Sequence, residues 1–210
     1  MIEKVITQLN VLFPEVKPEL NYTSDYQCLV AVMLSAQCTD KRVNMVTAKL
    51  FSEYGTPESM ITLSQNELES MIYSLGFFRN KAKNILAMTG EVLDKYNGEI
   101  PKTASELEKL PGVGRKTANV VASALYGEQK LGVDTHVLRV TNRLGLVKAK
   151  TPKEVEKQWY QRYPQYNNHD CHLRLVLFGR YYCKAQKPMC GVCKFVDFCK
   201  YYKEKSEVKK

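Results

Sequence analysis

A lysine and an aspartate are the residues of this 210-residue chain whose types and positions best suit chemistry. Lys116 stands in the first turn of a predicted helix over 116–126, where the positive end of the helix dipole disfavours a second cation. The amine is either a solvated charge beside an anion site or a nucleophile that the dipole and burial keep partly neutral. Asp134, or Thr135 directly after it, fits the N-cap of a later predicted helix. Together they predict a cleft that pairs an amine and a carboxylate over a nucleic-acid backbone.

The segment before Lys116 has the composition of a tight turn that binds a phosphate. The residues from Thr103 to Glu106 form a capping-box pattern that opens a short helix, and Pro111 ends it. The glycines that follow permit positive φ and let an external group approach the backbone amides. With the bare N–H groups of the next helix, the turn can hold a phosphate of any DNA sequence. The residues predicted to contact DNA here are Gly112, Val113, Gly114 and Arg115.

Four of the seven cysteines lie close together near the C-terminus, with the spacing C-x6-C-x2-C-x5-C. They are Cys183, Cys190, Cys193 and Cys199. Four thiolates at this density can fold a loop around an iron–sulfur cluster or around a structural zinc ion. A closed set of four thiolates leaves no open position for a substrate, so we expect a mainly structural metal. The other three cysteines, Cys28, Cys38 and Cys171, are expected to be ordinary thiols.

The charge of the chain indicates a polyanionic partner. The sequence has 31 basic and 22 acidic residues, which gives a net charge of +9. A merely soluble basic protein is the competing interpretation, but nucleic acid is the simplest partner for this balance. The first 20 residues lack the apolar core of a signal peptide, and no apolar run reaches membrane-spanning length. We therefore expect no membrane association and a cytoplasmic location.

Apolar residues recur at helical spacing along the chain, and no stretch alternates as a strand would, so the predicted fold class is all-α. The segment Cys28–Leu34 is apolar on every side and predicts a buried helix. A second capping-box pattern begins at Ser64. Thr151 is predicted to cap another helix, with Pro152 at its first position. Trp159 is expected in the core, and a helix is predicted to follow Phe77–Lys81.

The turn LPGVGRKTANV, the VDTH segment that contains Asp134 and the cysteine spacing together resemble endonuclease III. This family comprises DNA glycosylases with AP lyase activity in the helix-hairpin-helix superfamily. The resemblance covers the chain from Leu34 to Cys199. It implies two helical domains that flank a DNA-binding cleft: residues 18–128 with the helix-hairpin-helix motif, and residues 1–17 with 129–210, which carry a C-terminal cluster loop. It also implies that the four clustered cysteines hold a 4Fe-4S cluster.

The resemblance further implies a base-excision repair enzyme that acts as a monomer on damaged or abasic sites in double-stranded DNA at the nucleoid. Its substrates would be oxidised pyrimidines such as thymine glycol. Lys116 would attack the sugar C1′ to give a Schiff base, and β-elimination would cut the strand 3′ of the abasic site. Asp134 would assist base loss.

The same resemblance implies further contacts with DNA. Gln37, in the segment Leu34-Ser35-Ala36-Gln37, would occupy the space that an extruded nucleotide leaves. Phe77 would be a wedge, at a position where leucine is usual in the family. Lys184 and Lys187, in the cluster loop, would contact phosphates.

Three alternatives compete with this interpretation. An adenine glycosylase shares the hairpin and the cluster, but those relatives have another residue at the position of Lys116, a catalytic glutamate near Ala31 and a further C-terminal domain. A non-catalytic helix-hairpin-helix module would need the glycines without both Lys116 and Asp134. A ferredoxin-like electron carrier would explain the cysteines but neither the hairpin nor the positive charge.

Overall fold

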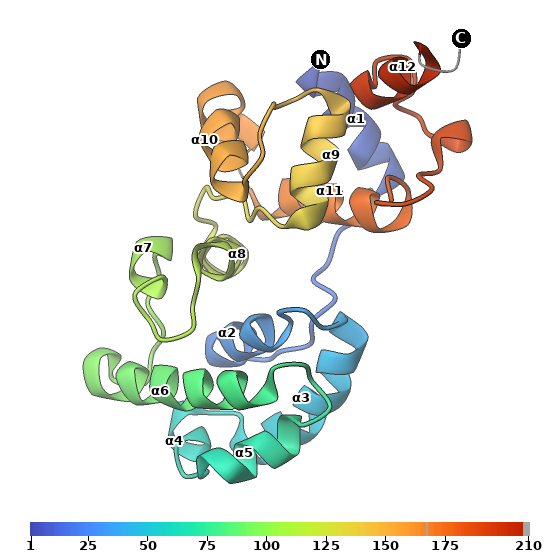
Figure 1. The fold of residues 1–210 in the computed structure, drawn as a ribbon. Coiled ribbons are helices and arrows are strands. Elements are labelled where there is room, and N and C mark those ends of the chain that lie inside the picture. Colours follow the sequence, from blue (N-terminus) through green and yellow to red (C-terminus); the bar gives the residue numbers. More distant parts are fainter. Residues whose placement is uncertain (167, 208–210) are drawn as a thin grey trace. The chain divides into compact units, whose positions relative to one another are not determined.

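The computed structural model describes residues 1–166 and 168–207, and every regular element within them is a helix. The all-α prediction is therefore confirmed for the described part of the chain. The chain divides into two compact units (Figure 1). The continuous unit is Pro18–Glu128, and the discontinuous unit combines Met1–Lys17 with Gln129–Lys210. None of the described helices is long and apolar enough to cross a membrane.

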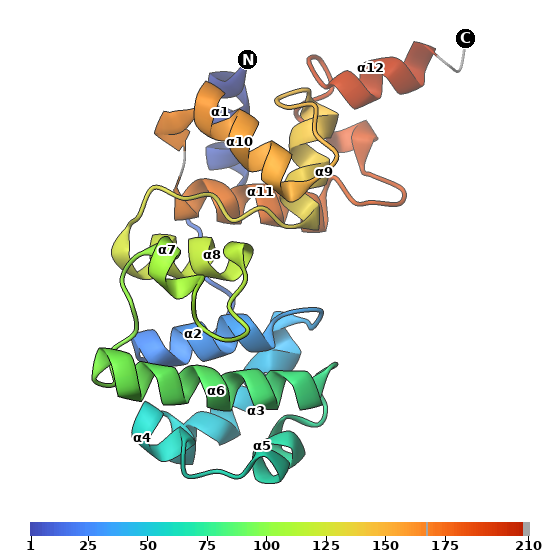
Figure 2. The ribbon, with the colours of Figure 1, turned by 60° about the vertical axis from the view of Figure 1, so that its left-hand side comes forward.

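The core of the continuous unit surrounds α2 (Asp25–Leu34). All residues of α2 from Cys28 onward are buried, which confirms the prediction of a helix that is apolar on every side. The long helix α6 (Phe78–Tyr96) runs beside α2 and also contacts α4 and α5 (Figure 2). The remaining helices of this unit are α3 (Asp40–Tyr54), α4 (Pro57–Met60), α5 (Gln65–Ile72), α7 (Ala104–Leu107) and α8 (Arg115–Tyr126).

Side-chain caps set where most of these helices begin. Ser64 and Glu67 form the predicted capping box at the start of α5, with the Ser64 N–H donating to Glu67 Oε2 at 2.8 Å. The sequence pattern placed the start of α6 after Lys81, and this is wrong, because the helix already begins at Phe78. Phe77 is therefore the N-cap of this helix, and the other residues of the segment form its first turn.

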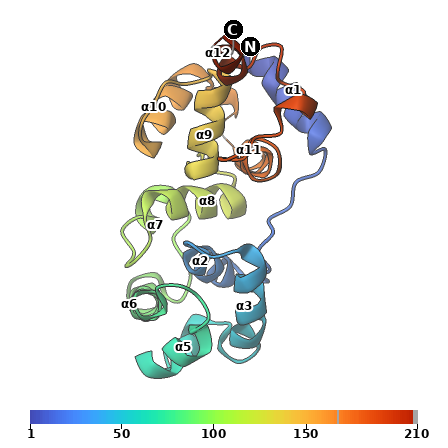
Figure 3. The ribbon, with the colours of Figure 1, turned by 45° about the vertical axis from the view of Figure 1, so that its right-hand side comes forward.

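The discontinuous unit is centred on α9 (Thr135–Leu144), which contacts α10, α11 and α12, while α1 (Ile2–Leu12) packs on α11 (Figure 3). Trp159 is fully buried in its core, as predicted. Thr151 caps α10 and Pro152 is its first residue, as predicted, and Glu154 completes a capping box with Thr151. The other helices of the unit are α10 (Pro152–Arg162), η1 (Pro164–Tyr166), α11 (His169–Tyr181), η2 (Cys190–Val192) and α12 (Lys200–Glu207).

Candidate functional site

The two glycines of the hairpin turn between α7 and α8 have different roles. Gly112 has a φ of +73°, and a Cβ added to it would lie 2.5 Å from Cβ of Asn84 on α6. Glycine is therefore required there both for the backbone conformation and for close packing against α6. Gly114, the N-cap of α8, has a φ of −83°, and a Cβ added to it would meet nothing within 4 Å. Its outer side is open to the approach of another molecule.

The start of α8 is suited to an anion. No side chain caps α8 in the described structure, whereas Ser, Thr, Asn or Asp caps most of the other helices. The amide dipoles of its first turn can thus be directed at an external acceptor such as a phosphate. Val113 contributes in another way, because its side chain is buried and its N–H donates to the Leu110 carbonyl at 3.1 Å. It shapes the turn and has no free group for a phosphate.

Lys116 is the second residue of α8, and its side chain is exposed. The expectation that burial would act on this amine is therefore wrong for the described structure. Arg115 is also exposed, and its Nη1 lies 3.8 Å from Glu108 Oε2 in a surface ion pair. The amine of Lys116 and the uncapped amides of α8 are presented on the same turn.

Asp134 is the N-cap of α9, as predicted for this residue. Its Oδ1 accepts a hydrogen bond from the Val137 N–H at 2.8 Å, and the residue is half-buried. The N-terminus of α9 thus fixes the carboxylate and stabilises its negative charge. Lys116 belongs to the continuous unit and Asp134 to the discontinuous unit.

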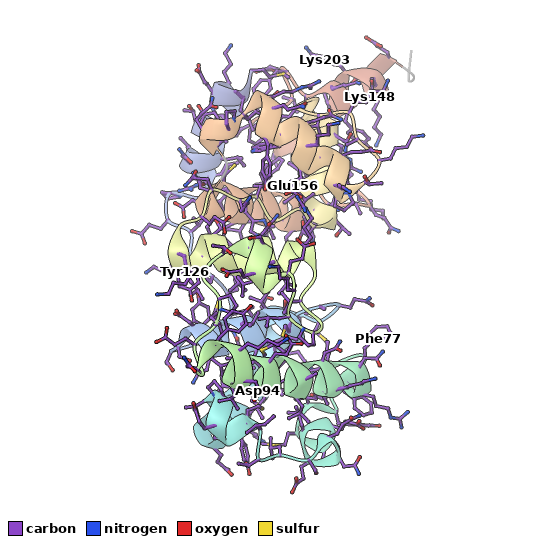
Figure 4. The ribbon with its side chains drawn as sticks, turned by 90° about the vertical axis from the view of Figure 1, so that its left-hand side faces the viewer. Phe77, Asp94, Tyr126, Lys148, Glu156 and Lys203 are labelled. Carbon is purple, nitrogen blue, oxygen red and sulfur yellow. The ribbon has the colours of Figure 1, made fainter. Side chains whose placement is uncertain are left out.

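Gln37, Phe77 and Gly112 line one hollow of about 240 Å³ in the continuous unit, together with Asn84 and Lys81 of α6. No sequence motif indicates that the turn after α2, the start of α6 and the hairpin meet. Phe77 lies at the N-terminal end of α6 (Figure 4), and 63% of it is exposed. The structure therefore brings the two residues predicted to enter DNA together with one glycine of the hairpin turn.

Both of these exposed residues have a strained backbone. Gln37 and Phe77 each have a φ of 57°, in the left-handed region that residues with a Cβ seldom adopt. For a bulky aromatic residue this conformation is a true outlier, and such strain is concentrated at functional sites. Single exposed apolar side chains are common, and several others are exposed in the described chain, so exposure alone does not distinguish Phe77. Its strained backbone is the feature that marks it as a candidate contact with another molecule.

The four clustered cysteines line a single cavity in the discontinuous unit, between the end of α11 and the start of α12. Phe178, Tyr182 and Tyr201 also line this cavity. Four thiols that face one apolar and aromatic space fit a four-thiolate centre in donor type and number. In the described residues no three His, Cys, Asp or Glu side chains are arranged to hold an ion.

Arg143 of α9, which sequence reasoning did not single out, holds the loop that begins at Cys183. Its guanidinium donates to the Lys184 carbonyl at 2.7 Å and to the Ala185 carbonyl at 3.0 Å, and Nη1 lies 3.6 Å from Cys183 Sγ. It also lies over the ring of Tyr201, 4.4 Å from its centre. No motif could have identified this arginine, because its partners lie about 40 residues along the chain.

The two lysines predicted to bind phosphates lie in this loop, and both are exposed. Lys187 has a φ of 47°, so it belongs with the few described non-glycine residues in the left-handed region. By contrast, burial raises the pKa of the Cys28 thiol and of the Cys171 thiol to about 12. This agrees with the expectation that both are ordinary thiols of the core.

Comparison with known proteins shows which family the chain resembles. The model of the HhH-GPD superfamily of base excision DNA repair proteins matches residues 30–165. The chain is 44% identical to endonuclease III of Bacillus subtilis (strain 168), over 95% of this chain and 91% of the relative. It is 42% identical to endonuclease III of Escherichia coli (strain K12), over 98% and 97% of the two chains.

Solved structures show the same similarity. A trapped covalent endonuclease III–DNA intermediate, described as an estranged-adenine complex, has a TM-score of 0.92 and 44% identity, covering 98% of this chain and 97% of that chain. A non-covalent endonuclease III–DNA complex has the same values. A thermostable thymine-DNA glycosylase, at 22% identity and a TM-score of 0.82, shares the fold.

Proposed function

This chain belongs to the HhH-GPD superfamily of base excision DNA repair proteins and, within it, to the endonuclease III family of DNA glycosylases with AP lyase activity. We propose that it removes oxidised pyrimidines such as thymine glycol from duplex DNA. The observation that carries the proposal is the match to a covalent endonuclease III–DNA intermediate along 98% of the chain. A covalent intermediate requires a nucleophile. Lys116, exposed at the uncapped start of α8, has the position and the chemistry for that role.

In the proposed reaction the neutral amine of Lys116 forms a bond to C1′ of the damaged nucleotide, and the bond from C1′ to the base breaks. The departing base takes the electron pair and a proton, and the sugar ring opens to leave an imine with the lysine. Loss of a proton from C2′ then breaks the bond between C3′ and its oxygen, which cuts the strand 3′ of the site. The imine draws electrons from C2′ and so makes the loss of that proton easier, and water later hydrolyses the imine to free the lysine.

Asp134 would act on the same nucleotide as Lys116. Its carboxylate can stabilise the positive charge that develops on the sugar as the base leaves, and it can help to move protons between the steps. The hydrogen bond from the Val137 N–H holds one carboxylate oxygen and so fixes the direction in which the group points. A fixed charge acts on the transition state without the cost of reorganising it.

Contacts with DNA would come from both units. The open side of Gly114 and the first-turn amides of α8 would bind a phosphate, with Arg115 beside them. Gln37 and Phe77 would enter the duplex, where unstacking a base costs a few kcal/mol. Lys184 and Lys187 would add phosphate contacts. The proposal includes action as a monomer and, because its substrate is DNA, a cytoplasmic location at the nucleoid.

We propose that Cys183, Cys190, Cys193 and Cys199 would hold a 4Fe-4S cluster, which would brace the loop that bears Lys184 and Lys187. The donor set alone also suits zinc, and the family supports the iron–sulfur alternative. Iron and sulfide analysis of the purified protein separates the two metals. Zinc without iron would overturn this part of the proposal.

Borohydride trapping tests the proposed nucleophile, because borohydride reduces an imine to a stable amine. The substrate is a duplex with one thymine glycol, and the variants are Lys116→Ala and the control Lys109→Ala, which removes another exposed lysine near the hairpin. We expect a covalent band with the native protein and with Lys109→Ala, and none with Lys116→Ala. Full trapping by Lys116→Ala would assign the nucleophile to another amine. A native protein that binds DNA yet traps neither thymine glycol nor a plain abasic site would be a binding module.

A further inference from the structure

Lys81 is a buried charge that the proposed reaction does not use. It lies on α6 with 8% of its surface exposed. Its ammonium donates to the Leu34 carbonyl at 2.9 Å and contacts Cys38 Sγ at 3.4 Å, and no carboxylate pairs with it in the described part of the chain. Removing an ammonium from water without an opposite charge is unfavourable, and an apolar side chain of similar size is often no less stable. Stability alone therefore does not account for a lysine at this position.

The contacts of Lys81 join the two segments that carry the predicted DNA-entering residues. Leu34 ends α2, and its carbonyl is one of those that a helix leaves unpaired at its C-terminus. Cys38 directly follows Gln37, so the ammonium holds the turn on both sides of Gln37. The backbone N–H of Lys81 donates to the Phe77 carbonyl at 3.0 Å. A single residue thus fixes the turn of Gln37 by its side chain and the start of α6 by its backbone.

The strained backbone at Gln37 and Phe77 needs contacts that hold it in place. Gln37 and Phe77 share a φ of 57°, and a left-handed backbone persists at non-glycine residues only where the surroundings hold it. Both residues are exposed on the rim of the same hollow, which Lys81 also lines. Without the ammonium, the turn after α2 would lose these two polar contacts with α6, and its backbone could relax away from the strained conformation.

We propose that Lys81 is a positioning residue for nucleotide extrusion: its ammonium holds the turn of Gln37 against the first turn of α6, so that Gln37 and Phe77 enter the duplex as one rigid unit. This inference rests on the proposed function and adds to it a residue that acts through Gln37 and Phe77 without contacting DNA. Preorganised groups bind more strongly because their ordering cost is met before the partner arrives.

The test compares two reactions that need extrusion to different degrees. Single-turnover rates are measured for thymine glycol excision and for strand cleavage at a plain abasic site, both in duplex DNA. Lys81→Met keeps the length of the side chain and removes the ammonium, and Lys83→Met removes an exposed charge from the same helix as the control. We expect Lys81→Met to slow excision about 10- to 100-fold, the value of a hydrogen bond to a charged group. It should leave abasic-site cleavage close to native, because no base must be unpaired there.

A second readout separates positioning from a structural role. A residue needed only for folding would lower both rates together, so the ratio of the two rates would stay at its native value and the inference would be overturned. The fluorescence of 2-aminopurine beside the lesion reports unstacking directly, and its increase on binding should be lost with Lys81→Met and kept with Lys83→Met. If Lys81→Met does not fold, the same ratio is measured for Lys81→Gln. Failure of the native protein in both reactions would instead refute the proposed function.

Discussion

Replacement of Gly112 by alanine tests the account of the hairpin most directly. At a φ of +73° an alanine is disfavoured by roughly 1–2 kcal/mol. Its methyl group would also lie 2.5 Å from Cβ of Asn84, an atom fixed to the backbone of α6 that no rotation can move aside. Overpacking of this kind costs about 1–3 kcal/mol. We therefore expect Gly112→Ala to lower the free energy of unfolding by about 2–5 kcal/mol.

Gly114→Ala provides the matched control two residues along the same turn. The backbone there is extended, and a Cβ has open space, so only the weaker preference of alanine for an N-cap applies. This loss should stay below about 1 kcal/mol. The added methyl group would stand on the side from which a phosphate reaches the amides of α8. We expect it to weaken DNA binding about 10- to 100-fold, the value of one charge-assisted hydrogen bond.

Urea unfolding and fluorescence anisotropy with a labelled duplex measure the two effects separately. The expected result is a loss chiefly of stability in Gly112→Ala and chiefly of affinity in Gly114→Ala. Equal stability losses in the two variants would refute the assignment of different roles to the two glycines. A Gly112→Ala protein within about 0.5 kcal/mol of native, the range of a neutral surface change, would refute the packing argument.

Three further outcomes follow from the structure. Asparagine caps helices as well as aspartate does, so Asp134→Asn should change the free energy of unfolding by less than about 0.5 kcal/mol. The same variant should slow thymine glycol excision in single-turnover assays. Excision at the native rate would contradict the role of the carboxylate. Asparagine tolerates the left-handed region, so Phe77→Asn should raise the free energy of unfolding by up to about 1 kcal/mol. It should also slow excision more than abasic-site cleavage. An unchanged ratio of the two rates would argue against a wedge. Burial raises the pKa of the Cys28 and Cys171 thiols from 9.0 to about 12, so the native state keeps two protons that the unfolded chain loses above pH 9. The free energy of unfolding should therefore fall between pH 9 and 12 by about 1.4 kcal/mol per pH unit for each thiol, and urea titrations of Cys28→Ala should show a shallower fall.

Local signals explain what could be predicted from the sequence. The capping boxes at Ser64 and at Thr151 involve partners three residues apart, so the sequence contains the whole interaction. The burial of α2 could be inferred because a helix that is apolar on every side has no face for water. Asp134 was predicted as an N-cap from the residues next to it, and the structure has it there.

Contacts between distant segments explain what the sequence could not give. Lys81 looks like part of a basic surface turn, and it is buried because the end of α2, 47 residues away, receives its ammonium. The difference between Gly112 and Gly114 depends on how closely α6 approaches, which their spacing does not encode. The exposure of Lys116 likewise follows from how α8 packs in its unit, so a dipole argument from sequence could not establish it.

Folding, and not DNA binding, covers the free-energy cost of the strained backbone at Gln37 and Phe77. Both residues have a left-handed backbone, and contacts within the continuous unit hold them there. Each such conformation lowers the free energy of unfolding of the continuous unit by about 1–3 kcal/mol. The free energy of DNA binding is not reduced by this cost. Unstacking a nucleotide costs a similar few kcal/mol. If Gln37 and Phe77 fill the vacated space as proposed, folding has already ordered them, and the free energy of DNA binding has to cover little more than the unstacking itself. With a flexible turn at Gln37, the free energy of DNA binding would have to cover the ordering of the turn as well.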